Sequence, residues 1–256
     1  MDLKINGKVA VITAASAGLG KNIAHALAAE GVHVVLFARS ADKLAALAQE
    51  ITAKHGVRAV AVPGDMRIAV KHLADTVNAM FNGTDILVLN TGRAPNPLRA
   101  TLDETEEKRW QEAYQNQLWG TIQVAKEMVP QMLKKQWGRV IAITSASVKQ
   151  PMPHHSLSTV FRAGVTAYMK HLANEVGSSG ITVNCVAPAL IDTSHRTGTA
   201  AYTPEQAEAR RKLTPLGRMG EQDEVCGVVA FLASTQAGFI TGSSISVDGG
   251  MIGSLF

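Results

Sequence analysis

A strand, a glycine turn and a helix follow one another near the start of the chain, and no other stretch constrains the fold as much. Residues 9–12 are a short apolar run with β-branched side chains, and Gly18 and Gly20 come soon after it. Apolar residues then recur at helical spacing, at Ile23, Ala24, Leu27 and Ala28. A buried strand that turns at once into a helix is typical of the opening unit of an α/β fold.

The same turn indicates a binding site for an anion. Backbone N–H groups at the start of a helix, and the positive end of its dipole, point to one place where a phosphate or pyrophosphate binds well. The dinucleotide fingerprint G-x-G-x-x-G is incomplete, because Ile23 stands where its third glycine would be. An ordinary strand–helix turn that needs glycines for positive φ is the alternative for this stretch alone.

Short apolar runs and amphipathic helical segments alternate along the rest of the chain. Strands are expected at residues 32–37, 58–62, 85–89, 139–144, 181–186 and 244–247. Helices are expected at residues 41–54, 67–81, 106–135, 161–176 and 225–232, with helix starts at the capping patterns of residues 101–104 and 203–206. This rhythm predicts a Rossmann-like, doubly wound parallel sheet of seven strands with helices on both faces.

The composition excludes several classes of protein. Hydrophobic residues make up 46% and charged residues 18% of the 256 positions, which is ordinary for a globular chain and unlike a disordered one. The length suits a single domain over residues 1–256. No apolar run approaches the roughly 20 residues that cross a bilayer, so no membrane association is expected. The first residues lack the pattern of a signal peptide, which favours a cytoplasmic location.

The charges and cysteines argue against nucleic acid and metal ligands. The net charge is +4, but Lys and Arg are scattered, with one tight cluster at residues 210–212, so nucleic acid is a poor fit. Cys185 and Cys226 lie far apart, which indicates neither a disulfide framework nor a zinc site. His171 and Glu175 are spaced as a salt-linked pair on a helix. We therefore expect no metal.

Several strand ends carry residues that suit a nucleotide. Arg39 follows the second strand, where a carboxylate would favour NAD; an arginine there favours a 2′-phosphate and hence NADP, unless it is only a surface residue. Asp65 follows the third strand and could accept from an adenine amino group, or simply stabilise a turn. Residues 90–92 follow the fourth strand. Because parallel strands end at one edge, these positions are expected to lie together.

Taken together, these motifs resemble the short-chain dehydrogenase/reductase family over about residues 5–253. Residues 13–20 are similar to its Thr-Gly-x-x-x-Gly-x-Gly turn, with Ala14 in place of the first glycine. The turn at 90–92 takes the place of Asn-Ala-Gly. Asp65, Ser145, residues 181–188, Thr193 and residues 240–250 follow in the family's order. The resemblance is closest to members like the 3-oxoacyl-carrier-protein reductases.

The resemblance implies a short-chain oxidoreductase that uses NADP (NADPH) on a small carbonyl or alcohol substrate and forms a homo-oligomer, a tetramer or a dimer. It implies a substrate lid at about residues 189–215, of which residues 189–202 are a loop before the next helix start. The cofactor-binding residues that it implies are Thr13, Ser16, Gly18, Leu19, Gly20, Arg39, Ser40, Asp65, Met66, Asn90, Thr91, Gly92, Arg162, Pro188, Ile191 and Thr193.

The catalytic residues depart from the family pattern, which makes the active site atypical. The family uses a serine to polarise the carbonyl, a tyrosine thirteen residues later to move the proton, and a lysine four residues after that. Counting from Ser145 gives Ser158 and Arg162 instead, and Gln117 stands where an asparagine is expected, next to Asn116. An aliphatic hydroxyl is a far weaker acid than a phenol, so Ser158 is a poor proton carrier.

The proton must then come from another group. His154 and His155 precede Ser158 by four and three residues, and histidine is the side-chain type that most often transfers protons near neutral pH, although these two could equally be solvent-exposed loop histidines. Three functions follow from this site: carbonyl reduction with NADPH, enolate chemistry without hydride transfer (aldol, dehydration or decarboxylation), and a catalytically silent NADP-binding protein. We rank them in that order.

Overall fold

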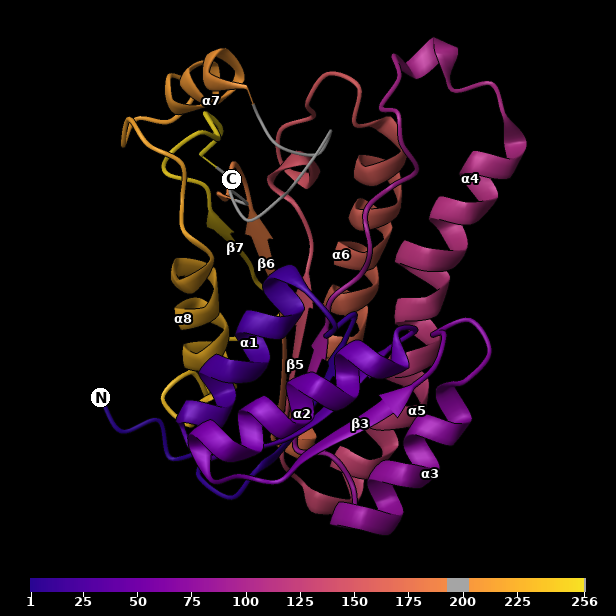
Figure 1. Ribbon diagram of the computed structural model, residues 1–256, viewed down its shortest axis with the longest axis vertical. Coiled ribbons are helices and arrows are strands. Elements are labelled where there is room, and N and C mark those ends of the chain that lie inside the picture. Colours follow the sequence, from indigo (N-terminus) through magenta and orange to yellow (C-terminus); the bar gives the residue numbers. More distant parts are fainter. Residues whose placement is uncertain (193–202, 256) are drawn as a thin grey trace.

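A computed structural model describes residues 1–192 and 203–255, and it confirms the predicted sheet. Seven parallel strands lie side by side in the order β3-β2-β1-β4-β5-β6-β7 (Figure 1). The strands are β1 Val9–Thr13, β2 His33–Ala38, β3 Ala59–Pro63, β4 Ile86–Leu89, β5 Gly138–Ile143, β6 Ile181–Pro188 and β7 Ser244–Val247. Since all pairs are parallel, every strand ends at the same edge of the sheet.

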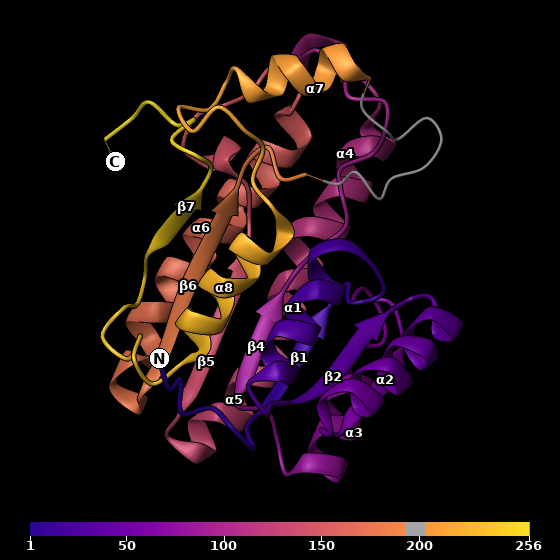
Figure 2. The same cartoon turned by 60° about the vertical axis from the view of Figure 1, so that its left-hand side comes forward.

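Helices cover both faces of the sheet, as predicted (Figure 2). One face packs against α1 Gly18–Ala29, α2 Ala41–His55 and α8 Gln222–Ala233. The other packs against α3 Val70–Phe81, α5 Gly120–Lys135 and α6 Ser156–Val176. Buried strand residues alternate between these two cores, which fixes the register of each strand. Across the described residues, none of the helices combines the length and the apolar character that crossing a bilayer requires.

The long helix expected at residues 106–135 consists of three joined segments. It contains α4 Glu107–Ala113, a π-helical stretch Tyr114–Trp119, and α5. The π-helical stretch carries Gln117, whose amide is fully buried and has no hydrogen-bond partner among the described residues. Insertions of π-helix occur often at functional sites, and this one faces α6, with Leu118 next to Gly164.

Two expected helix starts have different outcomes. The capping box predicted at residues 101–104 is wrong: Thr101–Asp103 is a single 3₁₀ turn, and the carboxylate of Glu104 binds Arg109 instead of a backbone N–H. The pattern at Thr203 is confirmed, because Thr203 and Gln206 form a reciprocal capping box at the start of α7 Pro204–Arg211. Further 3₁₀ turns lie at Ala146–Val148 and Gly177–Ser179.

Candidate active site

The turn between β1 and α1 presents uncapped backbone N–H groups at the carboxyl edge of the sheet. Ala17 precedes the helix and has no side-chain oxygen with which to cap it. Ala14, in place of the family's glycine, has a left-handed φ of 48°, and Gly18 has a φ of 55°. Left-handed backbone costs a residue with a Cβ about 1–2 kcal/mol. The turn is therefore held against its local preference, with the helix N-terminus open to an anion.

Thr13 and Asn90 join the ends of β1 and β4. The Thr13 Oγ1 donates to the Asn90 backbone oxygen at 2.6 Å and accepts from the Asn90 backbone N–H at 2.9 Å. Thr13 is fully buried, so its hydroxyl has a structural role: it links the end of β1, where the turn begins, to the end of β4. Next to it, the buried hydroxyl of Thr91 has no hydrogen-bond partner among the described residues. An orphaned buried hydroxyl at this edge is suited to a ligand that supplies the missing bond.

Residues at the ends of β2 and β3 form the next part of the edge. Arg39 is exposed just beyond β2, and Ser40 is the N-cap of the 15-residue helix α2, to which its side chain makes no capping bond. Asp65 follows β3 and accepts from Arg67 through Nε at 2.9 Å and Nη2 at 2.6 Å. These hydrogen bonds hold the pKa of the Asp65 carboxyl below its usual range. Met66 lies against Gly120.

Arg162 connects the ends of β4 and β5. Its Nη1 donates to the backbone oxygens of Ile143 at 2.8 Å and Thr144 at 3.0 Å, and its Nη2 to the Gly92 oxygen at 3.3 Å. Burial lowers the pKa of Arg162 to about 10. No carboxylate pairs with it in the part of the chain that the structure describes. A guanidinium has five N–H donors, so two of them can still bind an oxygen of a ligand.

Ser145 follows β5 and is oriented by Ser147, a partner that sequence reasoning missed. The Ser145 Oγ accepts from the Ser147 backbone N–H at 3.2 Å and from the Ser147 Oγ at 3.1 Å. With both bonds accepted, the hydroxyl proton of Ser145 can be donated elsewhere. The Ser-x-Ser spacing is the signal that could have revealed this pair, because serine hydroxyls often bind backbone two residues away.

Ser158 and the two histidines lie at the start of α6. Ser158 is in the first turn of the helix and is four residues before Arg162, so both side chains share one helix face. His155 directly precedes the helix, and its Nδ1 lies 2.7 Å from the Pro153 oxygen. His154 is exposed and has a left-handed φ of 63°. The structure thus brings Ser158 and Arg162 together on α6 and places the histidines in the loop before it.

The remaining expected residues follow β6. Pro188 ends the strand, and Ile191 forms a β-bridge with Gly220. The Asp192 N–H donates to the Gly220 oxygen at 2.6 Å, which anchors the start of the expected lid. Thr193 lies outside the described residues. Helix α7, within the expected lid, lies beyond the strand ends in both views (Figures 1 and 2).

Comparison with known proteins agrees with this geometry. The family described as enoyl-(acyl carrier protein) reductase matches residues 13–252. The 3-oxoacyl-[acyl-carrier-protein] reductases of Aquifex aeolicus and Staphylococcus epidermidis are 33% and 36% identical, over 98% and 95% of this chain and 100% and 98% of theirs. The chain belongs to the short-chain dehydrogenase/reductase family. The structure of L-sorbose reductase from Gluconobacter frateurii, complexed with NADPH and L-sorbose, has a TM-score of 0.88 and 32% identity and covers all of both chains.

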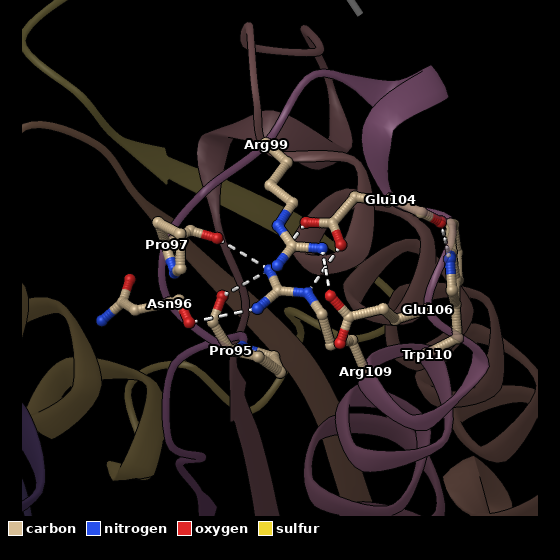
Figure 3. A network of polar contacts seen from close by, with 8 residues as sticks. All are labelled: Pro95, Asn96, Pro97, Arg99, Glu104, Glu106, Arg109 and Trp110. Carbon is tan, nitrogen blue, oxygen red and sulfur yellow. Dashed lines mark hydrogen bonds and ion pairs between the residues drawn. The ribbon is translucent and has the colours of Figure 1, made fainter.

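A buried ion pair fixes the loop that follows β4 in this short-chain dehydrogenase/reductase (Figure 3). Arg109 binds both carboxylate oxygens of Glu104 at 2.8 Å. Its remaining donors reach three backbone oxygens between β4 and α4, those of Pro95 at 3.2 Å, Asn96 at 3.1 Å and Pro97 at 2.7 Å. Gly92, near the start of this loop, accepts a hydrogen bond from Arg162. This network could not be predicted from the sequence, because Arg109 stands among other charged residues, a pattern typical of a solvent-exposed helix face.

We expect Arg109→Ala to destabilise the protein more than Arg99→Ala does. Removing Arg109 leaves the carboxylate of Glu104, whose side chain is 3% exposed, without its partner. Arg99 pairs with Glu106, which is 55% exposed, and water can replace that contact. Thermal unfolding of both variants measures the difference. Equal melting temperatures would show that the loop does not depend on this ion pair.

Proposed function

We propose that this protein is an NADPH-dependent oxidoreductase that reduces a small carbonyl compound, or oxidises the corresponding alcohol, in an atypical active site. The observation that carries the proposal is the carboxyl edge of the sheet, where an uncapped helix N-terminus, an exposed arginine and an orphaned hydroxyl follow three neighbouring strands. Related proteins support it, since the L-sorbose reductase structure contains NADPH.

The residues at this edge fit a phosphorylated dinucleotide. The α1 N-terminus would take the pyrophosphate and Arg39 with Ser40 the 2′-phosphate. Asp65, Asn90 to Gly92, Pro188, Ile191 and Thr193 would contact the rest of the cofactor, as the family pattern implies. When bound, the reduced nicotinamide supplies a hydride.

The polar groups near Arg162 would hold the carbonyl oxygen. Ser145 has a proton to donate, Ser158 adds a second hydroxyl, and Arg162 has uncommitted N–H donors. Preorganised donors of this kind stabilise negative charge that develops on oxygen. Neither serine is acidic enough to act as a general acid by itself. The proton therefore comes from His154, His155 or water.

Turnover tests separate this proposal from the alternatives. The protein is mixed with NADPH and a panel of aldehydes, ketones and 3-oxoacyl thioesters, and loss of nicotinamide absorbance is followed. Consumption that depends on the substrate supports carbonyl reduction. Product formed with no change in absorbance would favour enolate chemistry. NADP binding with no turnover of any substrate would favour a catalytically silent protein.

Replacing Arg39 by aspartate is expected to shift cofactor preference from NADP toward NAD. A carboxylate at this position repels a 2′-phosphate and can accept from the ribose hydroxyls of NAD. The measurement is the ratio of the two dissociation constants, obtained by calorimetric titration. An unchanged ratio would contradict the assigned role of Arg39.

The organisation around this activity is proposed from the same pattern. Residues 1–256 would form a single domain, with a substrate lid at about residues 189–215 that includes α7. The protein would act in the cytoplasm as a homo-oligomer, either a tetramer or a dimer. Light scattering coupled to size-exclusion chromatography measures the oligomer, and a monomeric mass would contradict that part of the proposal.

A further inference from the structure

The carboxylate of Asp65 is already occupied by an arginine two residues along the chain. Arg67 binds it with Nε, Nη2 and the backbone N–H, at 2.9, 2.6 and 2.9 Å. The Asp65 side chain is 15% exposed and that of Arg67 is 44% exposed. Two parallel N–H···O bonds from one guanidinium are the strongest arrangement for such a pair. The pair thus presents a neutralised acid at the end of β3.

Arg39 lies beside this pair because β2 and β3 are neighbours in the sheet. Ala38 pairs in register with Pro63, and the Gly64 N–H donates to the Ala38 oxygen at 2.9 Å. Arg39 and Asp65 therefore follow the ends of two adjacent strands that are in register with each other. The positive charge of Arg39 also contributes to lowering the pKa of Asp65, as expected for close neighbours. Without Arg67, Asp65 would offset the charge of Arg39.

We propose that Arg67 is a second determinant of selectivity for NADP over NAD, because it cancels the charge of Asp65 beside the place where Arg39 would bind the 2′-phosphate. The inference rests on the proposed binding of NADP. NAD has no phosphate at this position, so the charge of Asp65 matters much less for its binding. Arg67 is a positioning residue in this account, since it acts on the phosphate through Asp65.

The test is calorimetric titration of Arg67→Ala with oxidised NADP and NAD, which involves no turnover. We expect the affinity for NADP to fall about tenfold and that for NAD to stay within about twofold, because one unit charge is exposed next to a dianion at the surface. Most of this difference should disappear at 1 M salt, where the screening length is about 3 Å. Arg67→Lys should retain most of the selectivity.

Two further variants show whether the effect runs through Asp65. Asp65→Asn in the Arg67→Ala background removes the uncancelled charge, and we expect it to restore the NADP to NAD ratio to within about threefold of wild type. The matched control is Lys71→Ala. It removes an exposed cation that pairs with Asp75, four residues after Lys71, and its NADP to NAD affinity ratio should equal that of wild type. Melting temperatures verify that each variant is folded.

The outcomes separate this inference from the proposed function. If Arg67→Ala leaves the ratio unchanged while wild type binds NADP, the inference is overturned and the proposed function stands. If the double variant has the same NADP to NAD affinity ratio as Arg67→Ala, the claim that Arg67 acts by cancelling the charge of Asp65 is overturned. If wild-type protein binds neither cofactor at millimolar concentration, the proposed function falls, and this inference with it.

Discussion

Replacing Arg162 by alanine lowers kcat/KM about 10²- to 10³-fold, for whichever carbonyl substrate of the panel is turned over. Arg162 is a partly buried cation at the ends of β4 and β5, and in the proposed mechanism its two remaining N–H donors would bind the developing oxyanion. Loss of one such donor from a preorganised site costs about 2.7–4 kcal/mol of transition-state stabilisation. Steady-state kinetics with NADPH measures the effect.

The conservative variant and a nearby control make this prediction specific. Arg162→Lys keeps the positive charge, so its activity should recover to within about tenfold of wild type. The recovery stays incomplete because one ammonium cannot reproduce the fork of donors of a guanidinium. Lys170→Ala removes an exposed cation two turns farther along α6, whose Nζ donates to the Gly242 oxygen at 3.1 Å, and should leave kcat/KM unchanged. Activity of Arg162→Ala comparable to that of Lys170→Ala would show that the oxyanion is held elsewhere.

Replacing Gly20 by alanine is expected to weaken cofactor binding strongly and to destabilise the fold. A Cβ at Gly20 would overlap the backbone oxygen of Ala14 and come within 2.9 Å of the Asn90 Nδ2. Because the Ala14 backbone cannot yield as a flexible side chain would, α1 must move away from the ends of β1 and β4. Overpacking of this kind costs about 1–3 kcal/mol. We expect the affinity for NADP to fall at least about 100-fold, measured by calorimetry.

The control for this variant is Gly227→Ala. Gly227 lies inside α8, and apart from the adjacent backbone of that helix no atom of the described residues lies within 4 Å of an added Cβ. Alanine there should raise the free energy of unfolding by about 0.5–1 kcal/mol, because it reduces the entropy of the unfolded chain. Its affinity for NADP should not change. If Gly20→Ala binds NADP as tightly as Gly227→Ala does, the close contact between α1 and the strand ends is not required for the site.

Local patterns in the sequence predicted the architecture well. The final strand lies at residues 244–247 as expected, and α2 begins at Ala41 as expected. Elements of this kind can be predicted because the spacing of apolar residues repeats along the chain itself. The convergence of Arg39, Asp65 and Asn90 at one edge also followed, since it requires only that the strands be parallel.

Predictions from the sequence were wrong where the partner of a residue depends on how the chain folds. The pattern at residues 101–104 matches a capping box, yet Glu104 gains more from the fork of Arg109 inside the loop after β4. Arg67 was expected to begin the helix at residues 67–81, but that helix begins at Val70, and the turn after β3 brings Arg67 onto Asp65. A short motif indicates which hydrogen bonds a side chain can form with its neighbours in the sequence. It does not indicate whether a partner elsewhere in the folded chain binds that side chain more strongly.

The sequence by itself determined the order and type of the elements, the parallel sheet and the edge at which the candidate site residues meet. Only the tertiary structure decided what those residues bind. Thr13 meets Asn90 across 77 positions, and Arg162 reaches the ends of two strands at once. Hydrophobic periodicity is a local property that each segment carries with it, whereas a hydrogen bond between distant residues exists only after the strands have paired.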